Sequence, residues 1–273
     1  MKSEFIPFTP FNVYEEFSNK RTDTIAHIFR RPLLEYVERY MWLQDELTSG
    51  HLKFPLLEIG SGSGWGLQFI QKMFPHNISM GIDLDTTALS EGVSHGAHNL
   101  IQSNATHELP LSNSSFQTIV CFMMLEQLNP NDVKPFFLNL HRVAKPDAQF
   151  IIAMFNRELF SPNNKHWFTP NIQEYTKPEL TVLLQETGWQ IETSFGQRFV
   201  NPETYKNRAK VFQSIQDIML RTPQAQQIRF FRIMTPRLLN IAPSLVPHTT
   251  VELADEQIPR EPVINIVISR SCL

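Results

Sequence analysis

Cysteine is scarce in this sequence, because its 273 residues contain only Cys121 and Cys272. Two cysteines so far apart cannot form a disulfide framework or the ligand cage of a structural metal site. No bound metal is therefore expected, and a reducing compartment fits best. An excess of one charge is lacking too, since 24 basic and 27 acidic residues give a formal net charge of -3. Without a basic excess, a small-molecule substrate is favoured and no nucleic-acid partner is expected.

Long hydrophobic runs are also missing. No stretch reaches the ~18 apolar residues that a membrane-spanning helix needs. The first residues carry acidic side chains and prolines where a signal peptide needs an uninterrupted apolar run. We therefore expect a cytoplasmic protein without integral membrane association, and the sequence carries no signal for its oligomeric state.

The apolar residues that are present change their spacing along the chain. From Thr24 to about Leu47 they recur at helical spacing, which predicts an amphipathic helix. Beyond Pro55, short apolar runs alternate with helical stretches, which is typical of βαβ units and a parallel sheet. The predicted strands are Leu56–Ile59, Ile78–Ile82, Asn99–Gln102, Thr118–Phe122 and Gln149–Met154.

The last third of the chain predicts a return to the sheet. A helix over Lys177–Thr187, stopped by Gly188, precedes a strand over Trp189–Ser194, and the tail Pro262–Ser269 reads as a final strand. The long segment between these strands has helical patterning broken by prolines, so a structureless loop is improbable. The predicted organisation is a single domain over residues 1–273. It comprises an N-terminal helical cap (1–50), a core (51–198 and 262–273) and a helical insertion (199–261) that forms a lid over the substrate.

Within this insertion, arginines alternate with apolar residues over residues 221–241. The simplest interpretation is a helix packed on the core with a basic face in solvent. Two alternatives stay open: the arginines bind an acidic substrate, or the segment makes a peripheral contact with a membrane surface.

The strongest motif is a strand, a glycine loop and a helix, LLEIG-SGSG-WGLQFIQKMF. Gly60, Gly62 and Gly64 let the backbone turn sharply and bring its amides close to a ligand at the positive end of the following helix. The dinucleotide fingerprint G-x-G-x-x-G fails here, because its third glycine would fall on Trp65 or Leu67.

The pattern that is present, Glu58-x-Gly60-x-Gly62-x-Gly64, resembles motif I of the class I S-adenosylmethionine-dependent methyltransferases. A carboxylate beside the loop would attract a cationic ligand and repel a diphosphate. The resemblance extends from Leu56 to about Gly196. It implies S-adenosylmethionine as the cofactor, and an α/β Rossmann-like, doubly wound sheet of seven strands, mostly parallel with an antiparallel last strand.

The second strand ends in Gly-Ile-Asp-Leu-Asp, where Asp83 is placed to accept hydrogen bonds from two ribose hydroxyls. Asp85 could instead cap the next helix. In the related enzymes an aspartate after the third strand meets the adenine amino group, and Asn104 stands there with an amide oxygen that can still accept a hydrogen bond from that group. The expected cofactor-binding residues are Glu58, Gly60, Ser61, Gly62, Gly64, Asp83, Leu84, Asn104 and Ala105.

The sequence departs from the family after the fourth strand. A common Leu-Glu-His is Leu125-Glu126-Gln127 here, so the histidine that would serve as a base is missing. As catalytic candidates on the acceptor side we name Glu126, His166 and Tyr175, each of which could equally be a packing or capping residue. Asp147 and Ala148 replace two glycines before the fifth strand. Because residues other than glycine rarely adopt a positive φ, these replacements put the positive φ of that turn in doubt.

These observations predict methyl transfer to a small-molecule acceptor, such as a secondary metabolite, a sugar or a lipid precursor. A non-catalytic binding module on the same fold stays open, because Asn104, Gln117 and Gln127 depart from the family pattern. A protein-modifying methyltransferase also stays open. A nicotinamide-dependent oxidoreductase is disfavoured by the glycine spacing.

Overall fold

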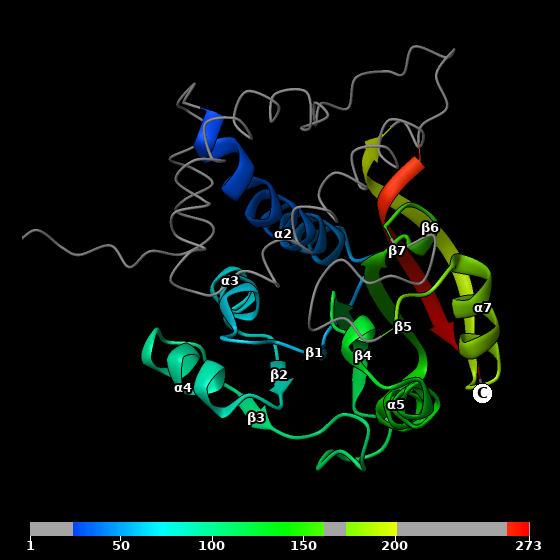
Figure 1. Cartoon of the computed structure of the whole chain (residues 1–273). Helices are drawn as coiled ribbons and strands as arrows, with labels where there is room; N and C mark the ends of the chain where they lie inside the picture. Colours follow the sequence, from blue (N-terminus) through cyan, green and yellow to red (C-terminus); the bar gives the residue numbers. More distant parts are fainter. Residues whose placement is uncertain (1–23, 161–172, 201–260, 273) are drawn as a thin grey trace, which may run out of the picture.

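The computed structural model describes residues 24–160, 173–200 and 261–272. Seven strands form one sheet in the order β3-β2-β1-β4-β5-β7-β6 (Figure 1). Strands β1 to β5 pair in parallel, and β7 lies antiparallel between β5 and β6. The predicted sheet and its antiparallel last strand are therefore confirmed. The strands are β1 (Leu56–Ile59), β2 (Ser79–Asp83), β3 (Leu100–Gln102), β4 (Phe116–Phe122), β5 (Ala144–Phe155), β6 (Trp189–Val200) and β7 (Glu261–Ser271).

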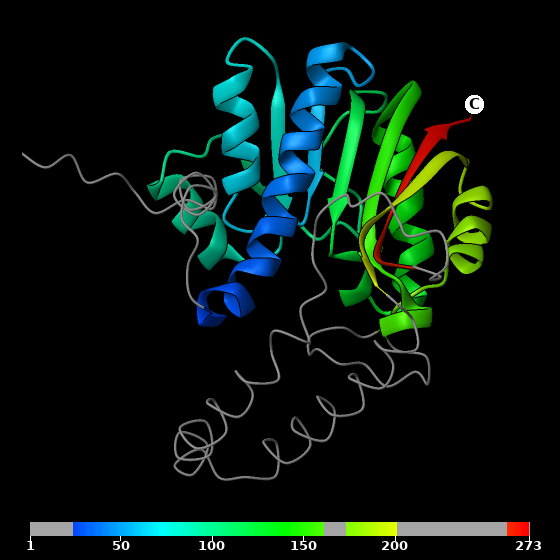
Figure 2. The ribbon, with the colours of Figure 1, turned by 90° about the horizontal axis from the view of Figure 1, so that it is seen from above.

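Helices cover both faces of the sheet (Figures 1 and 2). On one face, α2 (Thr24–Ser49) and α3 (Trp65–Met73) pack on Leu56, Val120 and Ile151. On the other face, α5 (Pro130–Val143) and α7 (Lys177–Gln185) pack on strand residues such as Leu57 and Ile119, which point away from α2 and α3. Because successive strand residues point to opposite faces, each central strand is buried on both sides. The remaining helices are α4 (Thr86–Ser94), the 3₁₀ helix η1 (Leu125–Gln127) and α6 (Arg157–Phe160).

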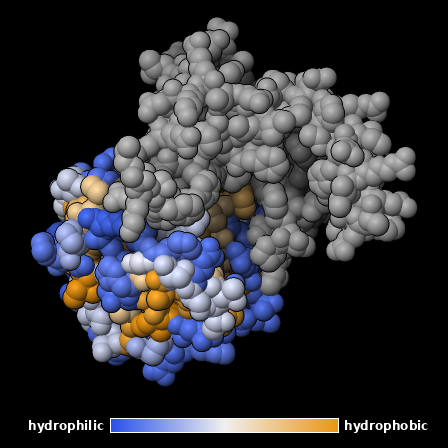
Figure 3. Space-filling view, turned by 90° about the vertical axis from the view of Figure 1, so that its left-hand side faces the viewer, coloured by the Kyte–Doolittle hydropathy of each residue, from blue (hydrophilic) through white to orange (hydrophobic). Residues whose placement is uncertain are grey.

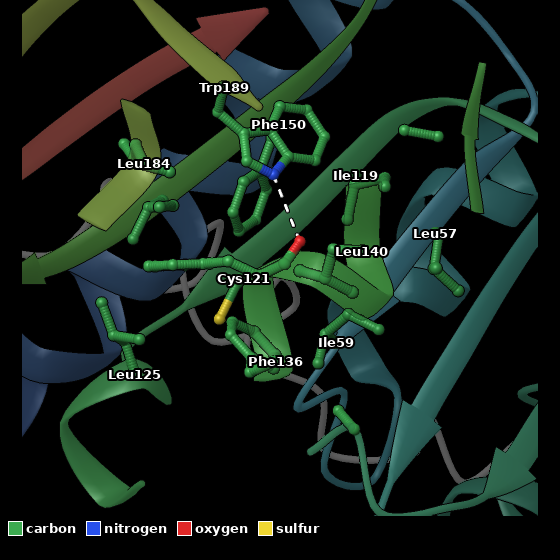
Figure 4. Close-up of a cluster of buried hydrophobic side chains, with 14 of the residues drawn as sticks. Leu57, Ile59, Ile119, Cys121, Leu125, Phe136, Leu140, Phe150, Leu184 and Trp189 are labelled. Atoms are coloured by element: carbon green, nitrogen blue, oxygen red, sulfur yellow. Dashed lines mark hydrogen bonds between the residues drawn. The ribbon is translucent and has the colours of Figure 1, made fainter. Parts of the chain in front are cut away.

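The core beneath α5 and α7 is built from large side chains. Trp189 at the start of β6 packs on Phe150 with their ring centroids 5.1 Å apart, and its indole nitrogen donates to the carbonyl oxygen of Phe137 at 3.3 Å (Figure 4). A buried indole thus keeps its hydrogen bond. This arrangement joins the end of the sheet that carries β6 to α5.

Surface features on the side that carries β3 and α4 are mixed. Hydrophilic residues dominate this side, with apolar groups between them (Figure 3).

None of the helices in the described ranges is long and apolar enough to cross a membrane. Within the same ranges, no group of three or more histidine, cysteine or acidic residues could hold a metal ion. Residues 201–260 of the predicted insertion, including the arginine-rich stretch 221–241, lie outside the described residues, whereas its end positions 199–200 and 261 belong to β6 and β7.

Asp147 and Ala148, which replace two glycines of the family pattern, lie within β5 rather than in a turn before it. Asp147 has φ 59°, in the left-handed region, whereas Ala148 has no positive φ and is fully buried. Aspartate is one of the few side chains that tolerate this region, since its short polar group can bond locally. Only the first of the two replaced glycines therefore needed a positive φ.

We expect Asp147→Gly to stabilise the protein by about 0.5–1 kcal/mol, because glycine adopts a positive φ without steric cost. Chemical denaturation should show this as a higher midpoint with an unchanged slope. Ala148→Gly is the matched control, and we expect it to destabilise because it loses a buried methyl group and adds freedom to the unfolded chain. Destabilisation by both variants would contradict the interpretation of Asp147.

Candidate functional site

A cavity of about 370 Å³ opens at the carboxyl ends of β1, β2 and β4. Ligands of open α/β sheets bind in this position, beside the strand where the order of the chain reverses. In the present sheet the reversal falls between β1 and β4. The cavity is lined by Ile59, Gly60, Gly62, Ile82, Asp83, Leu84, Ser103, Asn104, Ala105, Phe122, Met123, Met124, Gln127 and Leu128.

The glycine loop forms one wall of the cavity. A Cβ atom on Gly60, which has φ 74°, would lie 2.7 Å from Cγ of Met124, so a larger residue could not fit there. Gly62 has φ 54° and no atom within 4 Å of the position where its Cβ would lie, which leaves its backbone open to a ligand. Gly64 is the N-cap of α3, and its amide donates to the carbonyl oxygen of Ser61 at 2.8 Å. It is not among the residues that line the cavity.

Asp83 joins the second strand to the glycine loop. Its Oδ2 accepts from the amide of Gly62 at 2.7 Å, and its Oδ1 accepts from the amide of Asp85 at 2.9 Å. Each carboxylate oxygen has further acceptor capacity, so two ligand hydroxyls can still bind. Asp85 itself accepts from the amides of Thr87 and Ala88, which confirms its alternative role as the cap of α4.

Beyond Asp83, the wall continues through three residues expected in the site. Leu84 lines the cavity although its residue is 62% exposed, which places an apolar side chain at the rim. Asn104 and Ala105 follow on the loop after β3. The amide oxygen of Asn104 accepts from the amide of Thr106 at 3.0 Å and from its hydroxyl at 2.9 Å. Both lone pairs of that oxygen are then used, so Asn104 offers its amide nitrogen as a donor, which differs from the expected acceptor role.

Glu58 lies beneath the loop rather than in the cavity wall. Its position in β1 turns it toward the face covered by α2, and the residue is only 3% exposed. Burial raises the pKa of its carboxyl group to about 8, the hydrogen bond from Tyr40 opposes this, and the nearby charge of Asp83 raises the pKa further. Its Oε1 accepts from the Tyr40 hydroxyl, whereas its Oε2 has no partner among the described residues. A buried carboxylate oxygen without a partner is costly unless a ligand supplies one.

Two tyrosines of α2 connect this carboxyl group to α3. The hydroxyls of Tyr36 and Tyr40 are hydrogen-bonded to each other, and the Tyr36 hydroxyl accepts from the amide of Gly66 at 2.9 Å. The Tyr40 ring passes so close to Gly66 that a Cβ there would lie 2.0 Å from the ring. Helix α2 therefore holds Glu58 in place and lies directly on the first turn of α3.

The opposite wall comes from the end of β4 and the turn after it. Met123 has φ 58°, an uncommon conformation for a residue other than glycine, and its amide still donates to the carbonyl oxygen of Ala153 at 2.8 Å. Met123, Met124 and Gln127 all line the cavity. Strained backbone of this kind is frequent at functional sites. The turn presents polarisable sulfur atoms and one amide to a ligand.

Glu126 lies in the same turn but is fully enclosed, with 1% exposure. Its Oε1 accepts from the amide of Phe155 at 2.7 Å, whereas its Oε2 has no partner among the described residues. Burial raises the pKa of Glu126 to about 7; the hydrogen bond from Phe155 lowers it, and the charge of Glu174 raises it. The group is therefore suited to exchange a proton near neutral pH.

The other two catalytic candidates have different outcomes. Tyr175 is buried near Glu126, its hydroxyl has no partner among the described residues, and burial raises its pKa to about 12. It would therefore act as a donor rather than as a base. His166 lies outside the described residues.

The structure thus brings most of the predicted site residues together. Gly60, Gly62, Asp83, Leu84, Asn104 and Ala105 line the cavity, whereas Glu58, Ser61 and Gly64 do not. Sequence reasoning missed the walls formed by β4 and the contribution of α2. In the sequence, Tyr40 falls on the helical spacing of the apolar residues of α2. That spacing does not show that its hydroxyl donates to Glu58.

Two acidic groups near the loop have acceptor capacity left: Asp83 in the cavity wall, and the buried Oε2 of Glu58 beneath the loop. A diphosphate would face two carboxylates close to the loop, which opposes its binding.

Comparison with known proteins agrees with this chemistry. Residues 57–152 match the family described as "Methyltransferase domain". A protein of Mycolicibacterium smegmatis named "Probable S-adenosylmethionine-dependent methyltransferase" is 30% identical over 142 residues, which cover 52% of this chain and 54% of that protein. A relative with the same descriptive name in Mycobacterium tuberculosis is 29% identical over 135 residues, 49% of this chain and 48% of the relative. The chain spans about half the length of the curated relatives that it matches.

Solved structures show the same fold. An S-adenosylmethionine-dependent methyltransferase from Archaeoglobus fulgidus is similar with a TM-score of 0.52 and 14% identity, over 85% of this chain and 94% of that one. At this identity the likeness shows the fold alone.

Proposed function

We propose that this chain, whose residues 57–152 match the methyltransferase domain family, is a class I S-adenosylmethionine-dependent methyltransferase that transfers a methyl group to a small-molecule acceptor. The observation that carries this proposal is the buried, half-partnered carboxyl group of Glu58 beneath the glycine loop. S-adenosylmethionine carries an ammonium, a sulfonium and a ribose, and supplies an electrophilic methyl group when bound. Glu58 would hold the ammonium, and Asp83 the ribose hydroxyls.

The chain's own contribution to the reaction would be to position the reactants and to accept a proton. Much of the rate of a methyl transfer can come from alignment of the two reactants in a site that excludes water. Met123, Met124 and Phe122 form an apolar wall suited to that purpose. Glu126 would take the proton of the acceptor, since its pKa of about 7 and its unpartnered oxygen meet the needs of a base.

The acceptor is proposed to lie on the side of β4 opposite the glycine loop, near Glu126 and Tyr175. Both residues belong to segments that follow the carboxyl ends of the central strands, and Gln173 donates from its amide to the carbonyl oxygen of Glu126 at 3.1 Å. A Tyr175 hydroxyl that stays protonated could orient an oxygen or nitrogen atom of the acceptor. The role of the segment 199–261 as a lid and the cytoplasmic location stay predictions.

Calorimetric titration of the purified chain tests the cofactor assignment. We expect micromolar binding of S-adenosylmethionine and of S-adenosylhomocysteine, and no binding of NADH. NADH is the appropriate control because it has two ribose groups but adds a diphosphate. Failure to bind either sulfur compound would contradict the proposal, and preferential NADH binding would favour an oxidoreductase instead.

A further inference from the structure

Arg39 is the one basic side chain of α2 that the described residues bury, with 5% exposure. Its guanidinium lies over the ring of Phe122, with 5.8 Å from Cζ to the ring centroid. Phe122 lines the cofactor cavity, so the cation lies next to that cavity, separated from it by one aromatic ring. On its other side, Nη1 of Arg39 donates to the side-chain oxygen of Gln197 in β6 at 2.8 Å.

Among the described residues, the guanidinium of Arg39 has few direct polar contacts. Within the described part of the chain, the guanidinium makes that single hydrogen bond, and its Nε is buried without a partner. Burial lowers the pKa of the guanidinium, although nearby Glu35 and Glu126 oppose this. Arginine stays charged in proteins, so its buried donors call for an acceptor. The planar group offers a fork that suits a carboxylate or a phosphate.

The position of Arg39 indicates which molecule would supply that acceptor. The glycine loop and Asp83 line the cavity on the β1 and β2 side, whereas Arg39 lies between the ends of β4 and β6. Gln197 is also bound to α2, because its amide nitrogen donates to the carbonyl oxygen of Glu35 and to the carboxylate of Glu38, both at 2.9 Å. This network fixes the guanidinium beside the ends of β4 and β6, where the charge of Glu126 also acts on it.

We propose that Arg39 binds an anionic group of the methyl acceptor, a carboxylate or a phosphate, on the β4 and β6 side of the cofactor cavity. The inference rests on the proposed function, since it assigns the acceptor's charge for that reaction. It narrows the acceptor to a molecule with an anionic group close to the atom that is methylated. Glu126 lies near enough to Arg39 for their charges to interact, so one small molecule could contact both.

The test uses simple anions as probes on wild-type protein and Arg39→Met, each titrated with and without saturating S-adenosylhomocysteine. Benzoate and inorganic phosphate are the probes, and benzamide is the uncharged match for benzoate. We expect at least one anion to bind the wild-type chain and to bind Arg39→Met at least tenfold more weakly, while benzamide shows no difference between them. Equal anion binding by both proteins, or none by the wild type, would overturn the inference.

Controls separate this inference from folding and from the cofactor assignment. Arg39→Met should keep its melting temperature and its affinity for S-adenosylhomocysteine, because methionine fills the same apolar space without a buried charge. Arg270→Gln removes an exposed arginine paired with Glu192 and should leave anion binding unchanged. If Arg39→Met does not fold, Arg39→Lys keeps the charge but loses the fork, and should still weaken anion binding. If the wild-type protein does not bind S-adenosylhomocysteine, the proposed function itself is contradicted.

Discussion

Asp83→Ala should weaken the binding of S-adenosylmethionine at least about 100-fold, because two hydrogen bonds to a charged group contribute roughly 1.5–3 kcal/mol each. The same substitution releases the amide of Gly62, which donates to Oδ2 at 2.7 Å and holds the glycine loop against β2. Both effects act on the cofactor cavity. The variant should bind S-adenosylhomocysteine equally poorly, because the two compounds share the ribose. Calorimetric titration measures both constants.

Asp85→Ala provides the matched control for this prediction. Asp85 lies two residues further along the chain, is exposed, and caps α4 through the amides of Thr87 and Ala88. Loss of a cap costs about 1 kcal/mol of stability, so the variant should melt earlier. It should still bind the cofactor within a few-fold of the wild type, because its side chain does not line the cavity. If both variants bind alike, the role assigned to Asp83 is wrong.

The sheet could be predicted almost completely from the sequence, because apolar periodicity reports burial directly. The first strand was predicted at its observed bounds, Leu56–Ile59, and the helix that begins at Thr24 extends to Ser49. Boundaries were less accurate where pairing rather than burial extends a strand. Strand β6 runs to Val200 through its antiparallel pairing with β7, well beyond the predicted end at Ser194.

Site residues on the glycine loop were predictable for a different reason. Backbone turns of that kind require glycine, and the required spacing can be read from the sequence. The contributions of Tyr40 and Arg39 could not be predicted, because they depend on how α2 packs across the sheet. A tyrosine in an apolar stripe looks the same whether or not its hydroxyl meets a carboxylate. The hydrogen bonds that the side-chain oxygen of Asn104 accepts from Thr106 could not be predicted for a similar reason, since they depend on the conformation of one loop.

The ionisation of Glu58 links the α2 contacts to cofactor binding. In the ligand-free protein, burial raises its pKa to about 8, from 4.5 for an exposed group. A group with a raised folded-state pKa contributes stability that is fully present below the unfolded value and is lost as pH rises toward the folded value. The ligand-free protein should therefore lose stability between about pH 4.5 and 8 through this group. A bound ammonium would favour the ionised carboxylate and reverse that loss.

Affinity for S-adenosylmethionine should consequently rise about 30-fold from about pH 5.5 to about pH 7, if only the ionised form of Glu58 accepts the ammonium. This window keeps an amino group of ordinary pKa charged. The same binding should release close to one proton, which titrations in buffers of different ionisation enthalpy detect. A wild-type affinity that stays constant over this window would mean that Glu58 is ionised throughout.

Two variants identify the group responsible for that pH dependence. Glu58→Gln keeps the hydrogen bond from Tyr40 but cannot ionise, so its affinity should be low and constant across the window. Tyr40→Phe removes a hydrogen bond that lowers the pKa of Glu58, so the pKa of Glu58 should rise further in this variant. The affinity of Tyr40→Phe for S-adenosylmethionine at pH 7 should then fall, although it should still increase with pH. A pH dependence that survives in Glu58→Gln would assign the proton to another group. Its loss in Glu58→Gln, together with a lower affinity of Tyr40→Phe at pH 7, would show that α2 acts on the cofactor through this carboxyl group.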